Sequence, residues 1–291
     1  MASLRRHNYH ALSASKQCCL TRRSTGPATA GGVSLARSGF ATVARQAYTA
    51  RLRGPVSSNV RHRMTRLFSG SGSGIQTPDG CSVEFYRRLP YMGELSEIEA
   101  ELCKHAAALE LGCGTGRLCE RMRELGLHVT GVDESAEMLA HLPSRVTGIK
   151  GSIEALDLGR RWPAVLLPSH LINHPDELTR RRFVEAAMRH IEPTGVFYVK
   201  RHSTTWLEAV QQGLIGESNG VTYHADHVSR DGRSLTMTLR YEAFGQSWTQ
   251  SFTTCALDKH QIEEVLRSCG FRRFNWFGEK ALWVAATPSD A

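Results

Sequence analysis

Three glycines at alternate positions follow an acidic residue in the stretch ELGCGTG, which covers residues 110–116. An apolar run comes just before Glu110, and a helix-like stretch follows Gly116. Glycine permits a positive φ and lets a ligand approach the main chain closely, and the first N–H groups of the next helix point to the same place. The spacing therefore predicts a ligand-binding loop between a strand and a helix.

This loop differs from two other glycine-rich patterns. The dinucleotide fingerprint G-x-G-x-x-G would require a glycine where Arg117 stands, and a P-loop would require Gly-Lys followed by Ser or Thr. Neither pattern fits. What fits is E-x-G-x-G-x-G, carried by Glu110, Gly112, Gly114 and Gly116.

A second motif, VTGVDESAEML at residues 129–139, ends an apolar run at Asp133, and GSIEAL follows at 151–156. Together with the glycine loop, these motifs resemble those of the class I S-adenosylmethionine-dependent methyltransferases, over about residues 82–287. The resemblance implies S-adenosylmethionine as the cofactor. It also implies an α/β fold: a doubly wound, mostly parallel seven-stranded sheet with helices on both faces and an antiparallel β insertion before the last helix.

The resemblance assigns roles to the residues of the first two motifs. Glu110 would hold the ammonium group of the cofactor or order the glycine loop, where a negative charge would face a positive one. Gly112, Gly114 and Gly116 would let the methionyl part lie against the backbone. Asp133 would accept hydrogen bonds from both ribose hydroxyls.

The adenine site is implied in the same way. Ser135 would cap the next helix, and Met138 and Ile153 would sandwich the adenine ring. Many relatives place an aspartate where Ser152 stands, so the contact to the adenine amino group would be weaker here or would come from the backbone. By residue type, Met138 and Ile153 fit a hydrophobic core equally well.

Methyl transfer from a sulfonium mainly requires that the enzyme align the nucleophile with the methyl group and exclude water, and sometimes that it remove a proton. The stretch PSHLINHP, residues 168–175, follows the fourth expected strand, at the sheet edge where doubly wound folds bind ligands. His170 is the candidate general base, and Asn173 or His174 could orient the acceptor. The alternative interpretation of His170 is a structural or solvated loop histidine.

The same loop lacks the Asn/Asp-Pro-Pro-Tyr/Phe sequence of relatives that methylate amide or base nitrogens, and the carboxylates of magnesium-dependent relatives. This favours a metal-independent O-, N- or S-methyltransferase of a small molecule. Tyr86 and Tyr91 would cover the cofactor, and Trp206, Tyr223 or Trp248 would line the acceptor side.

No metal site is expected. The eight cysteines form no C-x-x-C pair, and none has a histidine at zinc-finger spacing. In HADH, a regular strand would send His224 and His227 to opposite faces.

Apolar periodicity places the elements around these residues. Residues 203–256 break the alternation of strands and helices, and their two-residue period predicts an antiparallel insertion of about three strands. A helix within 257–271 and two further apolar runs, 271–277 and 281–287, follow it. Strands are expected near 106–111, 127–132, 145–149, 163–168 and 194–200, and helices at 117–126, 135–142 and 176–191.

Residues 1–78 differ in composition from the rest of the chain. They hold twelve Arg or Lys and no Asp or Glu, so residues 79–291 carry the other 24 of the 36 basic residues against all 28 acidic ones. An acid-free segment rich in Arg, Ser and Ala is typical of transit peptides, and RLFS resembles a mitochondrial processing site cut after Phe68. We expect 1–78 to be a disordered mitochondrial leader with a flexible GSGSG, and 79–291 to be the methyltransferase domain; otherwise the protein is cytoplasmic.

The charge distribution bears on the partners. Because the region after the leader is slightly acidic, nucleic acid is an unfavoured partner, and no run reaches the roughly 18 apolar residues of a membrane span. Two other functions stay open: an RNA or protein methyltransferase of the organelle, and a non-catalytic assembly factor that binds the cofactor.

Overall fold

Two β-sheets organise the part of the chain that the computed structural model describes, residues 68–288. Most of the expected leader lies outside these residues. In chain order the elements are β1 (Ser69–Gly72), α2 (Val83–Arg88), α3 (Glu99–Leu102), β2 (Ala107–Leu111), α4 (Arg117–Glu124), β3 (His128–Asp133), α5 (Ala136–Leu139), β4 (Thr147–Lys150), β5 (Trp162–Leu167), the 3-10 helix η1 (Leu171–Asn173), α6 (Glu177–His190), β6 (Ile191–Lys200), α7 (Thr204–Ala209), β7 (Gly213–Ser218), β8 (Val221–Asp231), β9 (Ser234–Ala243), β10 (Gln246–Cys255), α8 (Lys259–Ser268), β11 (Arg273–Phe277) and β12 (Trp283–Thr287).

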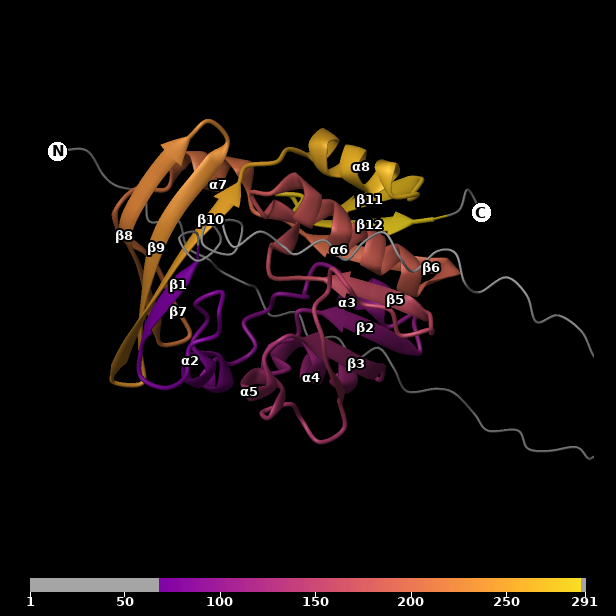
Figure 1. Ribbon diagram of the computed structural model, residues 1–291, viewed down its shortest axis with the longest axis horizontal. Helices are drawn as coiled ribbons and strands as arrows, with labels where there is room; N and C mark the ends of the chain where they lie inside the picture. The colour runs from indigo at the N-terminus through magenta and orange to yellow at the C-terminus, as the bar shows by residue number, and fades with distance from the viewer. Residues whose placement is uncertain (1–67, 289–291) are drawn as a thin grey trace, which may run out of the picture. The chain divides into compact units, whose positions relative to one another are not determined.

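The larger sheet has seven strands in the order β11-β12-β6-β5-β2-β3-β4, which confirms the expected fold class. Strands β4, β3, β2, β5 and β6 are parallel, and β12 and β11 add an antiparallel edge. Alternate residues of β2 face opposite layers: Leu109 packs with Phe183 of α6 and Ile262 of α8, whereas Ala108 packs with Met122 of α4. Helices therefore cover both faces (Figure 1).

The strand order creates a crevice at one edge of this sheet. From β2 the chain passes through α4 to β3 on one side, whereas β5, β2's other neighbour, is reached only after β4. The loops that follow β2 and β5 therefore diverge, and doubly wound folds bind ligands outside the carboxyl ends of the strands at such a point. This edge carries all the loops in which site residues were expected.

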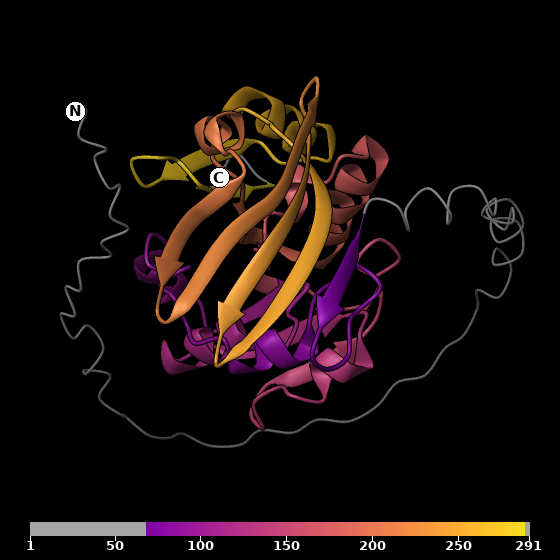
Figure 2. The same cartoon turned by 90° about the vertical axis from the view of Figure 1, so that its left-hand side faces the viewer.

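The smaller sheet is antiparallel, in the order β1-β10-β9-β8-β7 (Figure 2). Its inner face holds two apolar clusters. In one, Phe85 of α2 stacks on Tyr241 with ring centroids 4.7 Å apart, and in the other Leu207 of α7 packs against Met237. Helices α2 and α7 thus attach the sheet to the remainder of the chain, beside the end of the larger sheet where β2 and β5 terminate (Figure 1).

The insertion contains four strands, β7 to β10, rather than about three, and β1 joins them from the expected leader. The domain boundary expected at residue 78 is therefore too late. Ser69–Gly72 pairs with β10, and its glycines leave no room for side chains: a Cβ on Gly72 would lie 2.5 Å from Trp248 of β10, and a Cβ on Gly70 would lie 2.0 Å from the carbonyl oxygen of Gly80. The glycines of this segment serve close packing, which corrects the expectation of a flexible GSGSG.

A bulge in β8 also corrects the expected directions of two histidines. His224 pairs with Arg240, and His227 pairs with Thr238, because the register shifts between Ala225 and His227. Arg240 and Thr238 are two residues apart on β9 and share a face, so His224 and His227 do as well. His224 lies 3.7 Å from Glu242, and within residues 68–288 no cluster of three or more His, Cys, Asp or Glu could hold a metal ion.

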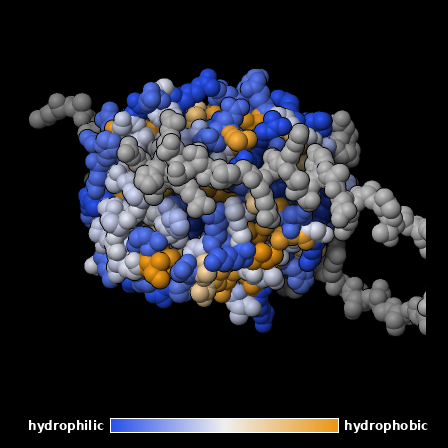
Figure 3. Space-filling model, in the orientation of Figure 1, coloured by the Kyte–Doolittle hydropathy of each residue, from blue (hydrophilic) through white to orange (hydrophobic). Residues whose placement is uncertain are grey.

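The surface is mixed in polarity. On the face seen in Figure 3, hydrophobic residues reach the surface in groups among hydrophilic ones. The large apolar side chains that are most exposed are Ile75, Leu178, Leu214 and Phe244. No helix among the described residues is long and apolar enough to cross a membrane.

Candidate active site

The three glycines of the loop after β2 all have positive φ, but their surroundings differ. A Cβ on Gly116 would meet Leu142 at 2.5 Å and Pro143 at 2.8 Å, so this glycine is required for packing. A Cβ on Gly112 would lie 3.0 Å from Leu171. Only at Gly114 would a Cβ point into open space, with no atom within 4 Å, so Gly114 offers the backbone face that a ligand can approach.

Asp133 ends β3 and fixes the same loop. Its Oδ2 accepts the N–H of Gly114 at 2.8 Å, and its Oδ1 accepts the N–H of Ser135 at 2.9 Å. Burial raises the pKa of Asp133, although both N–H groups favour the charged form. Because an ionised carboxylate has about four acceptor positions, two remain for a pair of ligand hydroxyls. The ribose of S-adenosylmethionine, which the sequence motifs imply as the partner of Asp133, therefore fits the acceptor positions that remain on this carboxylate.

Glu110 lies beneath the loop, with only 2% of its surface exposed. Its Oε2 accepts from the Sγ of Cys119 at 2.9 Å, and burial raises the pKa of Glu110 to about 8. Cys119 belongs to the first turn of α4. The contact braces the start of that helix, as the loop-ordering role requires. A contact to the cofactor's ammonium group stays a prediction.

The expected adenine residues lie at the ends of β3 and β4. The Oγ of Ser135 accepts the N–H of Met138 at 3.1 Å, so Ser135 caps α5 as expected. Met138 and Ile153 are 4% and 7% exposed, and Ser152 is half-buried. Ile153 borders the glycine loop, since its Cδ1 would lie 3.7 Å from a Cβ on Gly112. Their roles toward adenine stay predictions.

His170 follows β5, and both Ser169 and His170 have φ in the left-handed region, at 58° and 59°. The His170 ring stacks on the ring of His202, which comes from the loop after β6, with centroids 3.8 Å apart and planes 6° apart. The Trp206 ring also stacks on His202, with ring centroids 5.9 Å apart. Burial lowers the pKa of His170 well below its usual range and that of His202 to about 3, with a smaller contribution from the nearby Lys200. Both imidazoles are therefore neutral at pH 7.

Asn173 and His174, expected to orient an acceptor, are engaged by the protein itself. The Asn173 side chain is buried and bonds to main-chain groups of Cys255 and His202. The Nδ1 of His174 accepts the N–H of Asp176 at 3.1 Å, and its ring stacks on Phe68. The structure therefore does not support direct orientation of the acceptor by Asn173.

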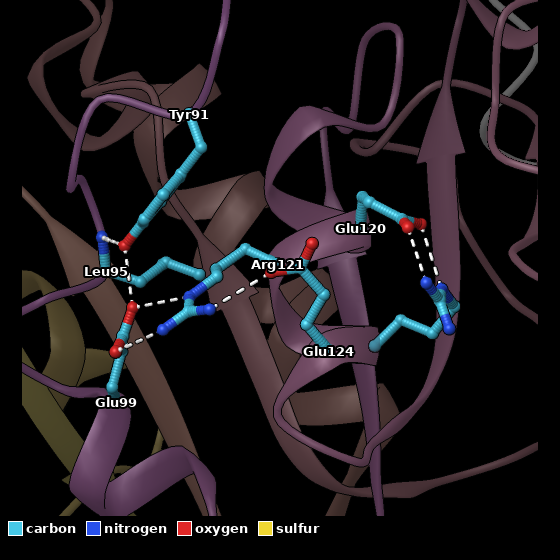
Figure 4. Close-up of polar contacts among 7 residues, drawn as sticks. Tyr91, Leu95, Glu99, Glu120, Arg121 and Glu124 are labelled. Atoms are coloured by element: carbon cyan, nitrogen blue, oxygen red, sulfur yellow. Dashed lines mark hydrogen bonds and ion pairs between the residues drawn. The ribbon is translucent and has the colours of Figure 1, made fainter. Parts of the chain in front are cut away.

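Tyr86 and Tyr91 border a cavity of about 350 Å³ beside the glycine loop, together with Gly116 and residues of α4. The Tyr91 hydroxyl donates to Glu99 at 2.9 Å and accepts the N–H of Leu95 at 3.0 Å (Figure 4). Arg121 of α4 joins the same group through Glu99. Because neither Gly114 nor Asp133 lines this cavity, Tyr91 braces α4 beside the site rather than facing Asp133.

The three aromatic residues expected on the acceptor side have different positions. Trp248 is 1% exposed, and its Nε1 donates to the carbonyl of Ser73, so it belongs to the core. Tyr223 lies on the inner face of the antiparallel sheet, with its hydroxyl 3.6 Å from the Sδ of Met92. Trp206 extends the histidine stack. Trp206 and Tyr223 remain acceptor-side candidates, whereas Trp248 does not.

His202 was missed as a site residue. The sequence offered one signal, because KRH at 200–202 directly follows a strand of the parallel sheet, and loops at that edge carry the ligand contacts. A Lys-Arg pair is, however, typical of exposed surface, because these residue types are seldom buried. Arg201 is in fact buried, and it donates to the main-chain carbonyls of Ala281 and Leu257.

Comparisons with known proteins agree with this geometry. Residues 108–195 match the family model of the methyltransferase domain. A putative methyltransferase of Bacillus subtilis (strain 168), YqeM, is 23% identical over 207 residues, which cover 65% of this chain and 83% of the relative. A ubiquinone biosynthesis O-methyltransferase of Chelativorans sp. (strain BNC1) is 31% identical over 116 residues, 37% of this chain and 44% of that protein.

The crystal structure of the sugar N-methyltransferase KedS8 from Streptoalloteichus sp. ATCC 53650 superposes with a TM-score of 0.57. The two proteins are 19% identical, and the match covers 71% of this chain and 92% of KedS8. At this identity the likeness shows the fold alone. The motif residues Glu110, Gly112, Gly114, Gly116 and Asp133 thus all lie within the stretch, residues 108–195, that matches the methyltransferase domain, on a chain that has the fold of a sugar N-methyltransferase.

Proposed function

We propose that this chain transfers a methyl group to an O, N or S nucleophile of a small molecule, held between the ends of β5 and β6 and the antiparallel sheet. The observation that carries the proposal is the attachment of that sheet to the loop after β5, through Asn173 to Cys255 and through Thr254 to Asn173. It sets a second sheet beside the edge where the cofactor is expected. A second sheet there would cover an acceptor, which would suit a small molecule, and the likeness to a sugar N-methyltransferase supports the same class of acceptor.

The residues present can carry out the protein's part of the reaction. Bound S-adenosylmethionine would supply an activated methyl group, with Asp133 and the backbone at Gly114 to hold it. In that transfer the methyl carbon would bond to the acceptor atom while its bond to sulfur breaks, and the electron pair would stay on sulfur. The acceptor then loses a proton, and neutral His170 can take it. A low pKa makes His170 a weak base, which suffices for an oxygen or sulfur acceptor because a methylated hydroxyl or thiol is strongly acidic until it loses its proton.

An untargeted label-transfer assay tests the proposal. With methyl-labelled S-adenosylmethionine and a mitochondrial extract, we expect label in the small-molecule fraction. His170→Asn should lower incorporation about tenfold, because asparagine tolerates the left-handed backbone but cannot take a proton. Since the pKa of His170 is lowered, the wild-type rate should stay level as the pH falls through about 6.5, where an ordinary histidine becomes protonated.

The same assay distinguishes the alternatives. Label in RNA or protein would favour a methyltransferase of organelle macromolecules. Intact cofactor binding with no label in any fraction would favour a non-catalytic assembly factor. An equal rate for wild type and His170→Asn would show that His170 is not the general base, while the chain would still act as a methyltransferase.

We also propose that residues 1–68 act as a mitochondrial transit peptide. The support is the absence of acidic residues before Asp79 and the RLFS site. Cleavage after Phe68 would leave Ser69, the first residue of β1, at the new N-terminus and would keep the whole of the antiparallel sheet. N-terminal sequencing of the protein from mitochondria should begin at Ser69; a start at Met1 would contradict the assignment.

A further inference from the structure

Two imidazoles at the acceptor edge come from different loops, His170 after β5 and His202 after β6. Their rings lie face to face, 3.8 Å apart between centroids and within 6° of parallel. A face-to-face pair directs its ring nitrogens sideways, where they can meet another molecule. It also lacks the edge-to-face attraction that aromatic pairs prefer, so the stack alone is a weak reason for two loops to hold this geometry.

Asn173 is bonded to the main chain on both sides of the pair. Its Oδ1 accepts the N–H of His202 at 2.9 Å, and its own N–H donates to the carbonyl of His170 at 2.9 Å. Asn173 is 1% exposed, so both bonds are shielded from water. An unmade bond here would leave a buried polar group without a partner, at a cost of about 1–3 kcal/mol.

The same residue is bonded to the antiparallel sheet. Its Nδ2 donates to the carbonyl of Cys255 at 2.8 Å, and its carbonyl accepts from the Thr254 hydroxyl at 3.2 Å. Thr254 and Cys255 are the last two residues of β10 and are buried. One asparagine therefore joins the loop after β5, the loop after β6 and the end of the insertion.

We propose that Asn173 is a positioning residue for methyl transfer, which sets the spacing of His170 and His202 and ties the pair to the antiparallel sheet. The proposal rests on the proposed function in one respect, that the histidine pair faces the acceptor. Asn173 acts through the two histidines and does not touch the acceptor. The end of β10 and the placement of the pair are then coupled through one residue, by its main chain to His170 and Thr254 and by its side chain to His202 and Cys255.

A histidine titration by NMR on the full-length chain tests this without a known acceptor. Lys200 and the Trp206 ring adjoin the stack, and burial with Lys200 keeps both pKa values low. In the wild type, the Cε1–H shifts of His170 and His202 should stay constant from pH 8 to pH 5. In Asn173→Ala, the loops separate and water enters, so both signals should titrate within that range. His170→Asn and His202→Asn assign the signals.

Two further variants keep the test decisive. Asn173→Asp keeps the oxygen that accepts from His202 but loses the donor to Cys255, and it replaces Asn173→Ala if that variant does not fold. Thr236→Val removes a hydroxyl contact to Thr253 within the antiparallel sheet that does not involve Asn173, and it is the matched control, with both histidine signals unchanged. In the label assay, Asn173→Ala should lower turnover about tenfold at unchanged cofactor affinity.

A folded Asn173→Ala or Asn173→Asp protein whose His170 and His202 signals match the wild type would overturn the proposal. The hydrogen bonds of the Asn173 amide would then have no effect on the position of the two histidines. If the signals respond while no label is transferred by the wild type, the positioning role stands and the proposed function fails. The two claims are therefore separable.

Discussion

Asp133→Ala is expected to lower the affinity for S-adenosylhomocysteine by about 100-fold, or about 3 kcal/mol. The variant removes the charged acceptor for two ribose hydroxyls, and it releases the N–H of Gly114, which the carboxylate holds at 2.8 Å. Both losses act on the cofactor, the first directly and the second through the loop. Isothermal titration calorimetry measures the change.

Glu134→Ala is the matched control for this variant. Glu134 is the next residue and also an acid, but it is exposed. Its removal should change the affinity by less than about twofold, as is usual for exposed charges. Equal affinities for Asp133→Ala and the wild type would show that the second motif does not bind the cofactor.

Alanine at Gly116 and at Gly114 should separate folding from binding. Gly116→Ala places a Cβ 2.5 Å from Leu142 and 2.8 Å from Pro143 at a φ of 84°, and we expect a loss of about 3 kcal/mol and a fall in Tm of about 10 °C. Gly114→Ala meets no atom within 4 Å, so only the backbone cost of about 1 kcal/mol remains. Its Cβ instead enters the space beside the loop.

Gly114→Ala should therefore fold nearly as well as the wild type, and it should bind S-adenosylhomocysteine at least tenfold more weakly. Thermal denaturation and calorimetry on the two variants give both quantities. If Gly114→Ala binds normally, the cofactor does not pass against this face of the loop.

The parallel sheet was predictable because its signals are local. Apolar runs such as Ala107–Leu111 and the glycine loop are read from neighbouring residues, and β2 to β6 formed where they were expected. β1 was not predictable, since SGSG has no strand propensity, and the close approach that it makes to Trp248 through Gly72 is visible only in the fold. The same limit applies to β7, whose GLIGES lacks the alternation of a half-buried strand.

The site residues also divide into those that lie in sequence motifs and those that only the fold brings together. Gly114 and Asp133 belong to contiguous motifs that the sequence shows directly, and the structure adds the hydrogen bond that joins them. The stack of His170 on His202 joins loops that only the fold brings together, and no sequence period encodes it. Asn173 illustrates this limit. Its residue type suggested contact with an acceptor, but in the folded chain its side-chain amide is hydrogen-bonded to Cys255 and His202.

Calorimetric titration of the wild-type chain with S-adenosylhomocysteine tests the central claim most directly. The account predicts one site per chain with a Kd of about 1 μM, or about −8 kcal/mol, and a raised Tm at saturating ligand. Neither heat of binding nor a shift in Tm, with S-adenosylhomocysteine or with S-adenosylmethionine, would contradict the assignment of the edge formed by Gly114 and Asp133 as a cofactor site.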